Sequence, residues 1–400
     1  MAFLSATLER VKPSPTIAIS TRAREMKAEG RDVIALSAGE PDFDTPAHVR
    51  EAAIAAIEAG RTRYTAPGGI PELKAAIAGK LMRDNGLHYG PGEIAVCTGG
   101  KQVIWAALTA TLDPGDEVIV PAPYWVSYPD MVRLAGGEPA IVPTGPADGY
   151  RLGPEALEAA IGPRTKWLIL NSPGNPTGAG YAAAHLRALA DVLLRHPQVH
   201  VMADDIYEHL VFDGFEFATP AAVEPRLKAR TLIVNGVSKS HAMTGWRIGY
   251  GAGPAPLIAA MTKLISQTTS CACSVAQWAA VAALEGPQDF VAESRAAFRR
   301  RRDLVVAALN DCPGIACPVP EGAFYVYPSI GGCIGATSAG GARIADDADF
   351  AAALLEEQGV AVVPGAAFGA SPAFRVSYAE ADEVLTEAMA RIRAFAEGLR

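Results

Sequence analysis

The chain has 400 residues, half of them hydrophobic and a fifth charged, a composition typical of a globular protein long enough for two or three domains. Its formal net charge of −8 argues against nucleic acid or an anionic membrane surface as a partner. No apolar run approaches the roughly 20 residues of a membrane span, and the N-terminus lacks the pattern of a signal peptide. We therefore expect a cytoplasmic protein.

The six cysteines indicate free thiols, because they are spread over the chain and none forms a C-x-x-C pair. Cys271 and Cys273 supply two thiols, which do not complete a four-ligand metal site. We predict no bound metal. The one basic run, Arg299 to Arg302, lies in a helical pattern and is expected to form a solvated or salt-bridged helix face.

The N-terminal part of the chain mixes helical and extended patterns. Residues 1–30 show a short helical pattern, and Pro13 and Pro15 predict an extended arm over 11–19, because proline disfavours helix in the residue before it. A strand is expected at 31–36, followed by a turn-rich loop and then a helix over 47–59.

From residue 72 helices and strands alternate, which predicts an α/β fold with a mostly parallel sheet between helices. Expected helices are 72–85, a helix opening at 98–102 and ending near 112, and 254–265; expected strands are 93–97, 117–120, 166–170, 199–203, 231–234 and 247–251. A long helical region at about 276–310 leads to a smaller C-terminal part. It contains a helix at 348–358, apolar segments at 360–365 and 374–378, and a final helix.

The segment Asn235–Tyr250 carries the strongest chemical signal. Lys239 follows a buried-strand pattern and a turn, in a weakly polar setting where loss of water lowers the pKa of an amine and makes it nucleophilic. Arg247 is suited to a forked contact with a phosphate. An amine nucleophile and a phosphate clamp are what pyridoxal phosphate (PLP) requires. A surface lysine and arginine between two core strands are the alternative.

The pattern S-K-x-x-x-M-T-G-W-R-I-G-Y in this segment resembles the Schiff-base lysine motif of the class I aminotransferases, which have PLP fold type I. The resemblance runs from about residue 12 to the C-terminus, with the motifs in the family's order. It implies that Lys239 binds PLP covalently and acts as general base and acid. It also implies that Ser238 and Arg247 hold the PLP phosphate.

The turn Gly99-Gly100 opens a helix and can direct backbone N–H groups at an anion. It is not a Walker A loop, since the first glycine is missing and Gln102 replaces Ser or Thr. The resemblance implies that this turn holds the PLP phosphate. Lys101 either helps to neutralise that phosphate or, as in one subgroup, reaches the distal carboxylate of a dicarboxylic substrate. Trp125 is expected to stack on the pyridine ring, with core packing as the alternative.

Two further motifs follow predicted strands. In N-S-P-G-N-P-T-G, the resemblance implies that Asn175 bonds the O3′ oxygen of PLP. The D-x-x-Y spacing selects Asp204 over Asp205 as the partner of the pyridine nitrogen, with Tyr207 donating to O3′. A carboxylate at the C-terminal end of a parallel strand is where open α/β sheets bind ligands.

Substrate contacts are also implied by the resemblance. Gly39, in G-E-P-D-F-D-T-P, would lie against the substrate carboxylate. Arg375 would pair with the α-carboxylate, because an arginine in an apolar strand is costly unless it meets an anion; an internal salt bridge is the alternative. Lys12 and Thr16 resemble a subgroup that also aminates prephenate. The expected substrate-binding set also contains Lys101, Trp125 and Asn175.

Tyr64 implies a second chain. In the family the matching tyrosine reaches the neighbour's cofactor phosphate, so a homodimer with shared active sites is expected. The expected organisation is an N-terminal arm and part of a small domain at 1–45, a large PLP-binding domain at 46–284, and a small α+β domain at 285–400.

These motifs predict a PLP-dependent aminotransferase acting on L-aspartate and 2-oxoglutarate. The enzyme alternatives are a bifunctional aspartate/prephenate aminotransferase making arogenate, an aminotransferase of other amino acids, and other PLP chemistry such as C–S lysis. A PLP-dependent transcription regulator is disfavoured because the motifs begin near residue 12 and leave no room for a helix-turn-helix domain. A binding-only protein is disfavoured because every named catalytic residue is present.

Overall fold

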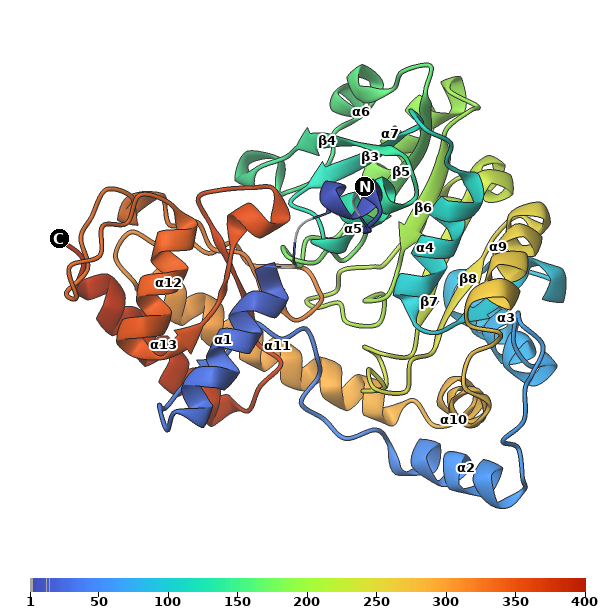
Figure 1. Ribbon diagram of the computed structural model, residues 1–400, viewed down its shortest axis with the longest axis horizontal. Coiled ribbons are helices and arrows are strands. Elements are labelled where there is room, and N and C mark those ends of the chain that lie inside the picture. The colour runs from blue at the N-terminus through green and yellow to red at the C-terminus, as the bar shows by residue number, and fades with distance from the viewer. Residues whose placement is uncertain (1–2, 12, 14) are drawn as a thin grey trace.

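The computed structural model describes residues 3–11, 13 and 15–400. A seven-stranded sheet forms the centre of the larger part of the molecule, in the order β2-β8-β7-β6-β5-β3-β4 (Figure 1). Strand β8 pairs antiparallel with β2 and β7, and the other strand pairs of this sheet are parallel. The strands are β2 Ile94–Cys97, β3 Glu117–Ala122, β4 Glu138–Pro143, β5 Thr165–Asn171, β6 His200–Asp204, β7 Thr231–Gly236 and β8 Gly249–Ala252.

Helices cover both faces of this sheet. Successive strand residues point to opposite sides, so the apolar side chains of one strand pack against helices on both faces. On β5, Trp167 and Ile169 pack into one apolar cluster with α4, α5 and α9, whereas Leu168 and Leu170 pack into another with α6 and α7. The helices of this part are α2 Ala47–Glu58, α3 Pro71–Asn85, α4 Gly100–Thr111, α5 Ser127–Leu134, α6 Pro154–Ala160, α7 Ala183–Arg195, α8 Pro220–Val223, α9 Ala255–Thr268 and α10 Ser274–Glu285.

The smaller part joins the two ends of the chain. Strand β1 (Ile34–Ala35) pairs in parallel with β10 (Val360–Ala361), and a three-stranded antiparallel sheet has the order β11-β12-β9. Its remaining elements are α1 Pro15–Ala28, α11 Asp289–Asn310, β9 Tyr325–Val326, α12 Asp347–Gln358, β11 Val363–Pro364, β12 Phe374–Ser377 and α13 Asp382–Glu397. In Figure 1, α11 extends from beside the larger part into this C-terminal part.

Six short 3₁₀ helices complete the secondary structure: η1 Ala6–Arg10, η2 Pro91–Glu93, η3 Pro146–Asp148, η4 Pro225–Arg230, η5 Gly331–Cys333 and η6 Gly365–Phe368. Within the described residues, no helix combines the length and hydropathy needed to cross a membrane.

The predicted α/β class with a mostly parallel sheet is confirmed, and two expectations are wrong. The arm over 11–19 is not extended throughout, because α1 begins at Pro15; proline fits the first helical turn, where its missing N–H costs nothing. The helical region 276–310 is two helices, α10 and α11, which are separated at 286–288. Pro287 in this break cannot donate a helical hydrogen bond. The domain boundaries at 45 and 284 stay a prediction.

The basic run on α11 is salt-bridged, as predicted, but half of it is not solvated. Arg301 and Arg302 are buried, and Arg301 contacts Asp42 at 2.7 Å and Asp382 at 3.0 Å. These contacts tie the loop after β1 to α11 and α13.

Candidate active site

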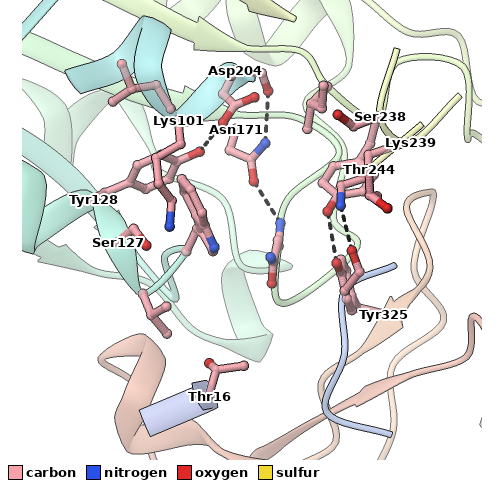
Figure 2. Close-up of a pocket in the computed structure, with 18 of the residues that line it drawn as sticks. Thr16, Lys101, Ser127, Tyr128, Asn171, Asp204, Ser238, Lys239, Thr244 and Tyr325 are labelled. Carbon is pink, nitrogen blue, oxygen red and sulfur yellow. Dashed lines mark hydrogen bonds between the residues drawn. The ribbon is translucent and has the colours of Figure 1, made fainter. Parts of the chain in front are cut away.

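A cavity of about 370 Å³ opens where β5, β6 and β7 end and the smaller part begins. Figure 2 shows that its side chains come from segments far apart in the sequence. It gathers nearly all the predicted site residues: Thr16, Gly39, Gly100, Lys101, Trp125, Asn175, Asp204, Tyr207, Ser238, Lys239, Arg247 and Arg375.

Lys239 lies in this cavity because β7 ends at Gly236 and the chain turns there. Its Nζ donates to the Gly39 carbonyl oxygen at 2.5 Å. Removal from water lowers the pKa of Lys239 to about 8, while the Glu40 carboxylate acts in the opposite direction. An amine with such a pKa is partly neutral near pH 7–8 and can act as a nucleophile.

Asp204 is the last residue of β6 and is buried. Tyr128 donates its hydroxyl proton to Asp204 Oδ2 at 2.6 Å. Burial raises the pKa of Asp204 to about 6, and the Tyr128 hydrogen bond opposes this rise. Asp205 does not line the cavity. The D-x-x-Y spacing therefore selected the carboxylate that faces the cavity.

Arg375, on β12, has no carboxylate partner among the described residues. Its Nη1 donates to Asn175 Oδ1 at 2.9 Å and its Nη2 to the Ser37 carbonyl oxygen at 2.6 Å. Its Nε is buried without a hydrogen-bond partner. The alternative of an internal salt bridge is therefore wrong for the described residues. A buried guanidinium with a free donor is suited to an external anion.

A second group of residues at the cavity combines the backbone of Gly99 and Gly100 with the side chain of Arg247. Gly99 has a φ of 82°, and a Cβ there would lie 2.3 Å from Arg247 Nη2, so only glycine permits this approach. The helix α4 begins at Gly100, and its free N–H groups favour an anion. Together with Ser238, these groups form a site suited to a phosphate.

Lys101, on the first turn of α4, places its Nζ 4.8 Å from the centre of the Trp125 ring. Burial lowers the pKa of Lys101, and the nearby Arg247 cation lowers it further. The cavity thus contains Lys101 and Arg375 as cations in addition to Arg247, which lies beside Gly99.

The family model described as "Aminotransferase class I and II" matches residues 31–392. The chain belongs to this family. It is 66% identical to the aspartate/prephenate aminotransferase of Cereibacter sphaeroides over the whole of both chains. It is 55% identical to an aspartate aminotransferase of Rhizobium meliloti, over 99% of this chain and 96% of that one.

Two solved structures similar to this chain are those of proteins named aspartate aminotransferase. The crystal structure of aspartate aminotransferase from Rhizobium meliloti has a TM-score of 0.98 at 54% identity and covers all of both chains. The Thermus thermophilus aspartate aminotransferase with maleate has a TM-score of 0.92 at 46% identity, over 99% of this chain and 100% of that one. The predictions of the family, its fold and an enzyme are confirmed.

Two of the predicted residues that the structure describes, Tyr64 and Gly99, do not line the cavity. Tyr64 is 89% exposed, as expected of a residue assigned to a neighbour's site, and that role stays a prediction. Lys12 lies outside the described residues. Gly99 does not line the cavity itself but contacts Arg247, which does.

Several cavity residues were not assigned from the sequence, among them Tyr128, Asn171 and Tyr325. Asn171 donates to the Asp204 carbonyl oxygen and accepts from the Asn175 backbone N–H, so it links two predicted residues. Tyr128 lies in the sequence P-A-P-Y-W-V-S-Y and Tyr325 in E-G-A-F-Y-V-Y, but these patterns alone do not separate a site residue from a core residue.

Proposed function

We propose that this aminotransferase moves the amino group between L-aspartate and 2-oxoglutarate with PLP as its cofactor. The observation that carries the proposal is a buried, low-pKa amine in a cavity that holds Lys101 and Arg375 as cations in addition to Arg247. A dicarboxylic amino acid has one carboxylate for Lys101 and one for Arg375. The names of the similar proteins from Cereibacter sphaeroides and Rhizobium meliloti support this choice of substrate.

The residues present fit PLP. Gly99, Gly100, Ser238 and Arg247 would hold its phosphate, since the glycine turn leaves room for an anion beside the guanidinium. Trp125 would cover the pyridine ring. When bound, PLP supplies an aldehyde that takes up an amine and a ring that withdraws electrons from the substrate Cα.

Each polar group would then orient or move a proton. Asp204 as an anion would keep a proton on the pyridine nitrogen, and Asn175 and Tyr207 would hydrogen-bond O3′. Lys239 would take the proton from the substrate Cα as a base and deliver it to the cofactor carbon as an acid. Its Nζ already lies at the Gly39 carbonyl, where the substrate carboxylate is expected.

The test is the half-reaction with one substrate. L-aspartate added to the PLP-loaded protein, without any 2-oxo acid, should convert the cofactor absorbance to that of pyridoxamine phosphate and release oxaloacetate. Conversion only with aromatic or neutral amino acids would keep an aminotransferase and reject the dicarboxylic substrate.

A second activity, on prephenate, is favoured by one observation. Thr16 lines the cavity, and its buried Oγ1 has no hydrogen-bond partner among the described residues, which suits it to bind a substrate group. The 66% identical protein carries "aspartate/prephenate" in its name. Arogenate and oxaloacetate should then yield aspartate; no aspartate from this pair would remove the second activity.

We also infer a homodimer in the cytoplasm. The exposed ring of Tyr64 supports the dimer, because an exposed tyrosine next to a Pro-Gly turn is available to a neighbour. The absence of a membrane-crossing helix among the described residues is compatible with a cytoplasmic enzyme.

A further inference from the structure

Tyr325, on β9, is a cavity residue for which the proposed function gives no role. It is 1% exposed, and its hydroxyl lies 2.9 Å from the hydroxyl of Tyr207. The guanidinium carbon of Arg375 lies 4.7 Å from the centre of its ring. A Cβ at Gly39 would lie 2.5 Å from its hydroxyl oxygen. Tyr325 therefore contacts Tyr207, Arg375 and Gly39 at once, and Figure 2 shows it facing the Lys239 side of the cavity.

The two hydroxyls constrain each other. Either can donate to the other, and each has only one proton. If Tyr207 donates its proton to the O3′ oxygen of PLP, the hydrogen bond between the two tyrosines must come from Tyr325. Chains of hydrogen bonds polarise one another, so the Tyr325 donor strengthens the bond that Tyr207 makes.

Arg375 makes Tyr325 suited to be that donor. Burial raises the pKa of the Tyr325 hydroxyl, and the Arg375 cation opposes this rise. A cation that favours loss of the proton also makes the phenol a stronger hydrogen-bond donor. Burial also raises the pKa of Tyr207, so neither hydroxyl ionises near pH 7.

We propose that Tyr325 is a positioning residue that donates its hydroxyl proton to Tyr207 and so directs the Tyr207 proton to the O3′ oxygen. This inference rests on the proposed PLP-dependent function. The same side chain then serves two parts of the site. Its ring packs against Arg375, and its hydroxyl hydrogen-bonds to Tyr207.

The direct readout is a pH titration of the absorbance of the PLP-loaded protein. A donor to the phenolic oxygen of PLP favours the deprotonated form and lowers the titration midpoint. Tyr325→Phe weakens that donor and should raise the midpoint by about 0.5–1 pH unit, the shift that corresponds to one net hydrogen bond. An unchanged midpoint would overturn the proposal.

Tyr327 offers a matched control. It is buried two residues further along, and its hydroxyl donates to the Ala370 carbonyl oxygen at 2.5 Å, outside the cavity. Tyr327→Phe should leave the midpoint unchanged. Equal shifts in both variants would mean a general effect of losing a buried hydroxyl, and would also overturn the proposal.

A double-mutant comparison tests the route through Tyr207. In a Tyr207→Phe background, Tyr325→Phe should add no further shift, because the side chain that transmits its effect is gone. The full shift in that background would contradict the proposal. Should Tyr325→Phe lack the native circular dichroism spectrum, 3-fluorotyrosine at 325 keeps the ring, strengthens the donor and should lower the midpoint.

Failure of the proposed PLP-dependent function would give a different absorbance result from failure of the role of Tyr325. A wild-type protein that acquires no PLP absorbance band fails as a PLP enzyme, whereas a wild type that titrates normally and a Tyr325→Phe variant that titrates identically reject only the role of Tyr325.

Discussion

At the scale of single residues, the surroundings of Lys239 set the pKa of its amine. It lies 2.5 Å from a carbonyl oxygen, and burial lowers its pKa to about 8. An unperturbed lysine has a pKa near 10.4. The protein thus keeps a nucleophilic fraction of amine that a surface lysine at the same pH lacks.

This pKa predicts how fast the cofactor-free protein combines with PLP. The neutral amine forms as the pH rises through the pKa, so the rate should increase with pH and reach half of its plateau near pH 8. Stopped-flow absorbance with excess PLP from pH 6 to 10.5 measures this. A midpoint near 10.4 would mean that the lysine is hydrated and that the cavity does not tune it.

Lys239→Ala should lower half-transamination of L-aspartate by at least about 100-fold, since a positioned acid–base residue contributes 10²- to 10⁴-fold. Lys263→Ala is the matched control, because Lys263 is an exposed lysine on α9. Single-turnover absorbance measures both. Near wild-type turnover by Lys239→Ala would remove the lysine from the mechanism.

Lys101→Met should weaken selection of dicarboxylic substrates. Loss of one charged hydrogen bond should lower kcat/KM for aspartate by about 10- to 100-fold and leave the value for alanine within a factor of three. Steady-state kinetics with both amino acids, and Lys263→Met as the control, measure the difference. Equal losses for both substrates would assign Lys101 to the cofactor phosphate instead.

Spacing within a motif was sufficient to predict some of these site residues and insufficient to predict others. The D-x-x-Y spacing identified Asp204, which is the last residue of β6 and lines the cavity, over Asp205, which does not line it. The Tyr128 hydrogen bond to Asp204 joins residues 76 positions apart. No local pattern contains that pairing, because it depends on how α5 packs against β6.

At the scale of elements, a buried polar network ties α3 to the segments that carry the site. Glu208, just after β6, accepts hydrogen bonds from Lys80 on α3, from Asn85 at 2.8 Å and from Asn235 on β7 at 2.8 Å. Lys80 and Glu208 are both buried. Tyr207 precedes Glu208, so this network braces the turn that presents it.

Lys80→Met should lower the free energy of unfolding by about 3 kcal/mol, because it leaves the Glu208 charge buried without its cation. Lys74→Met, on the same helix, should cost less than about 1 kcal/mol, since Lys74 bonds only a carbonyl at 3.1 Å. Urea unfolding measures both. Glu208→Gln added to Lys80→Met should recover part of the loss; no loss in the single variant would contradict the account.

Hydrophobic periodicity predicted many of the elements but missed β4, α5, α6 and α7. The limits of two predicted elements depended on proline context. Strands β5 and β7 contain the continuous apolar runs that are typical of buried parallel strands. Pro15 was taken to oppose a helix and instead starts α1, and Pro287 was overlooked inside a helical pattern that it interrupts. The same residue type has opposite effects at a helix start and in a helix interior.

At the scale of the whole molecule, the site brings together residues from both ends of the chain. Thr16 and Gly39 come from the N-terminal segment, Lys239 from the large sheet, and Tyr325 and Arg375 from the C-terminal part. Only the family resemblance indicated from sequence that these segments meet. The structure adds the contacts between them, such as that of Arg375 with Asn175.

Subunit mixing tests the proposed shared site. Tyr64→Ala and Lys239→Ala homodimers should each show strongly reduced activity, whereas a hybrid dimer has one site with both residues intact and should regain about half of the wild-type activity. Refolding the two variants together and assaying purified hybrids measures this. No recovery in hybrids would place both residues in one chain's site or remove Tyr64 from catalysis.

The most direct test of the central claim follows the nitrogen atom itself. Purified protein with PLP, ¹⁵N-labelled L-aspartate and 2-oxoglutarate should yield ¹⁵N-glutamate and oxaloacetate in equal amounts, and Lys239→Ala should yield neither above background. Mass spectrometry of the products gives both quantities. Wild-type protein that binds PLP but leaves the label in aspartate would contradict the proposed function.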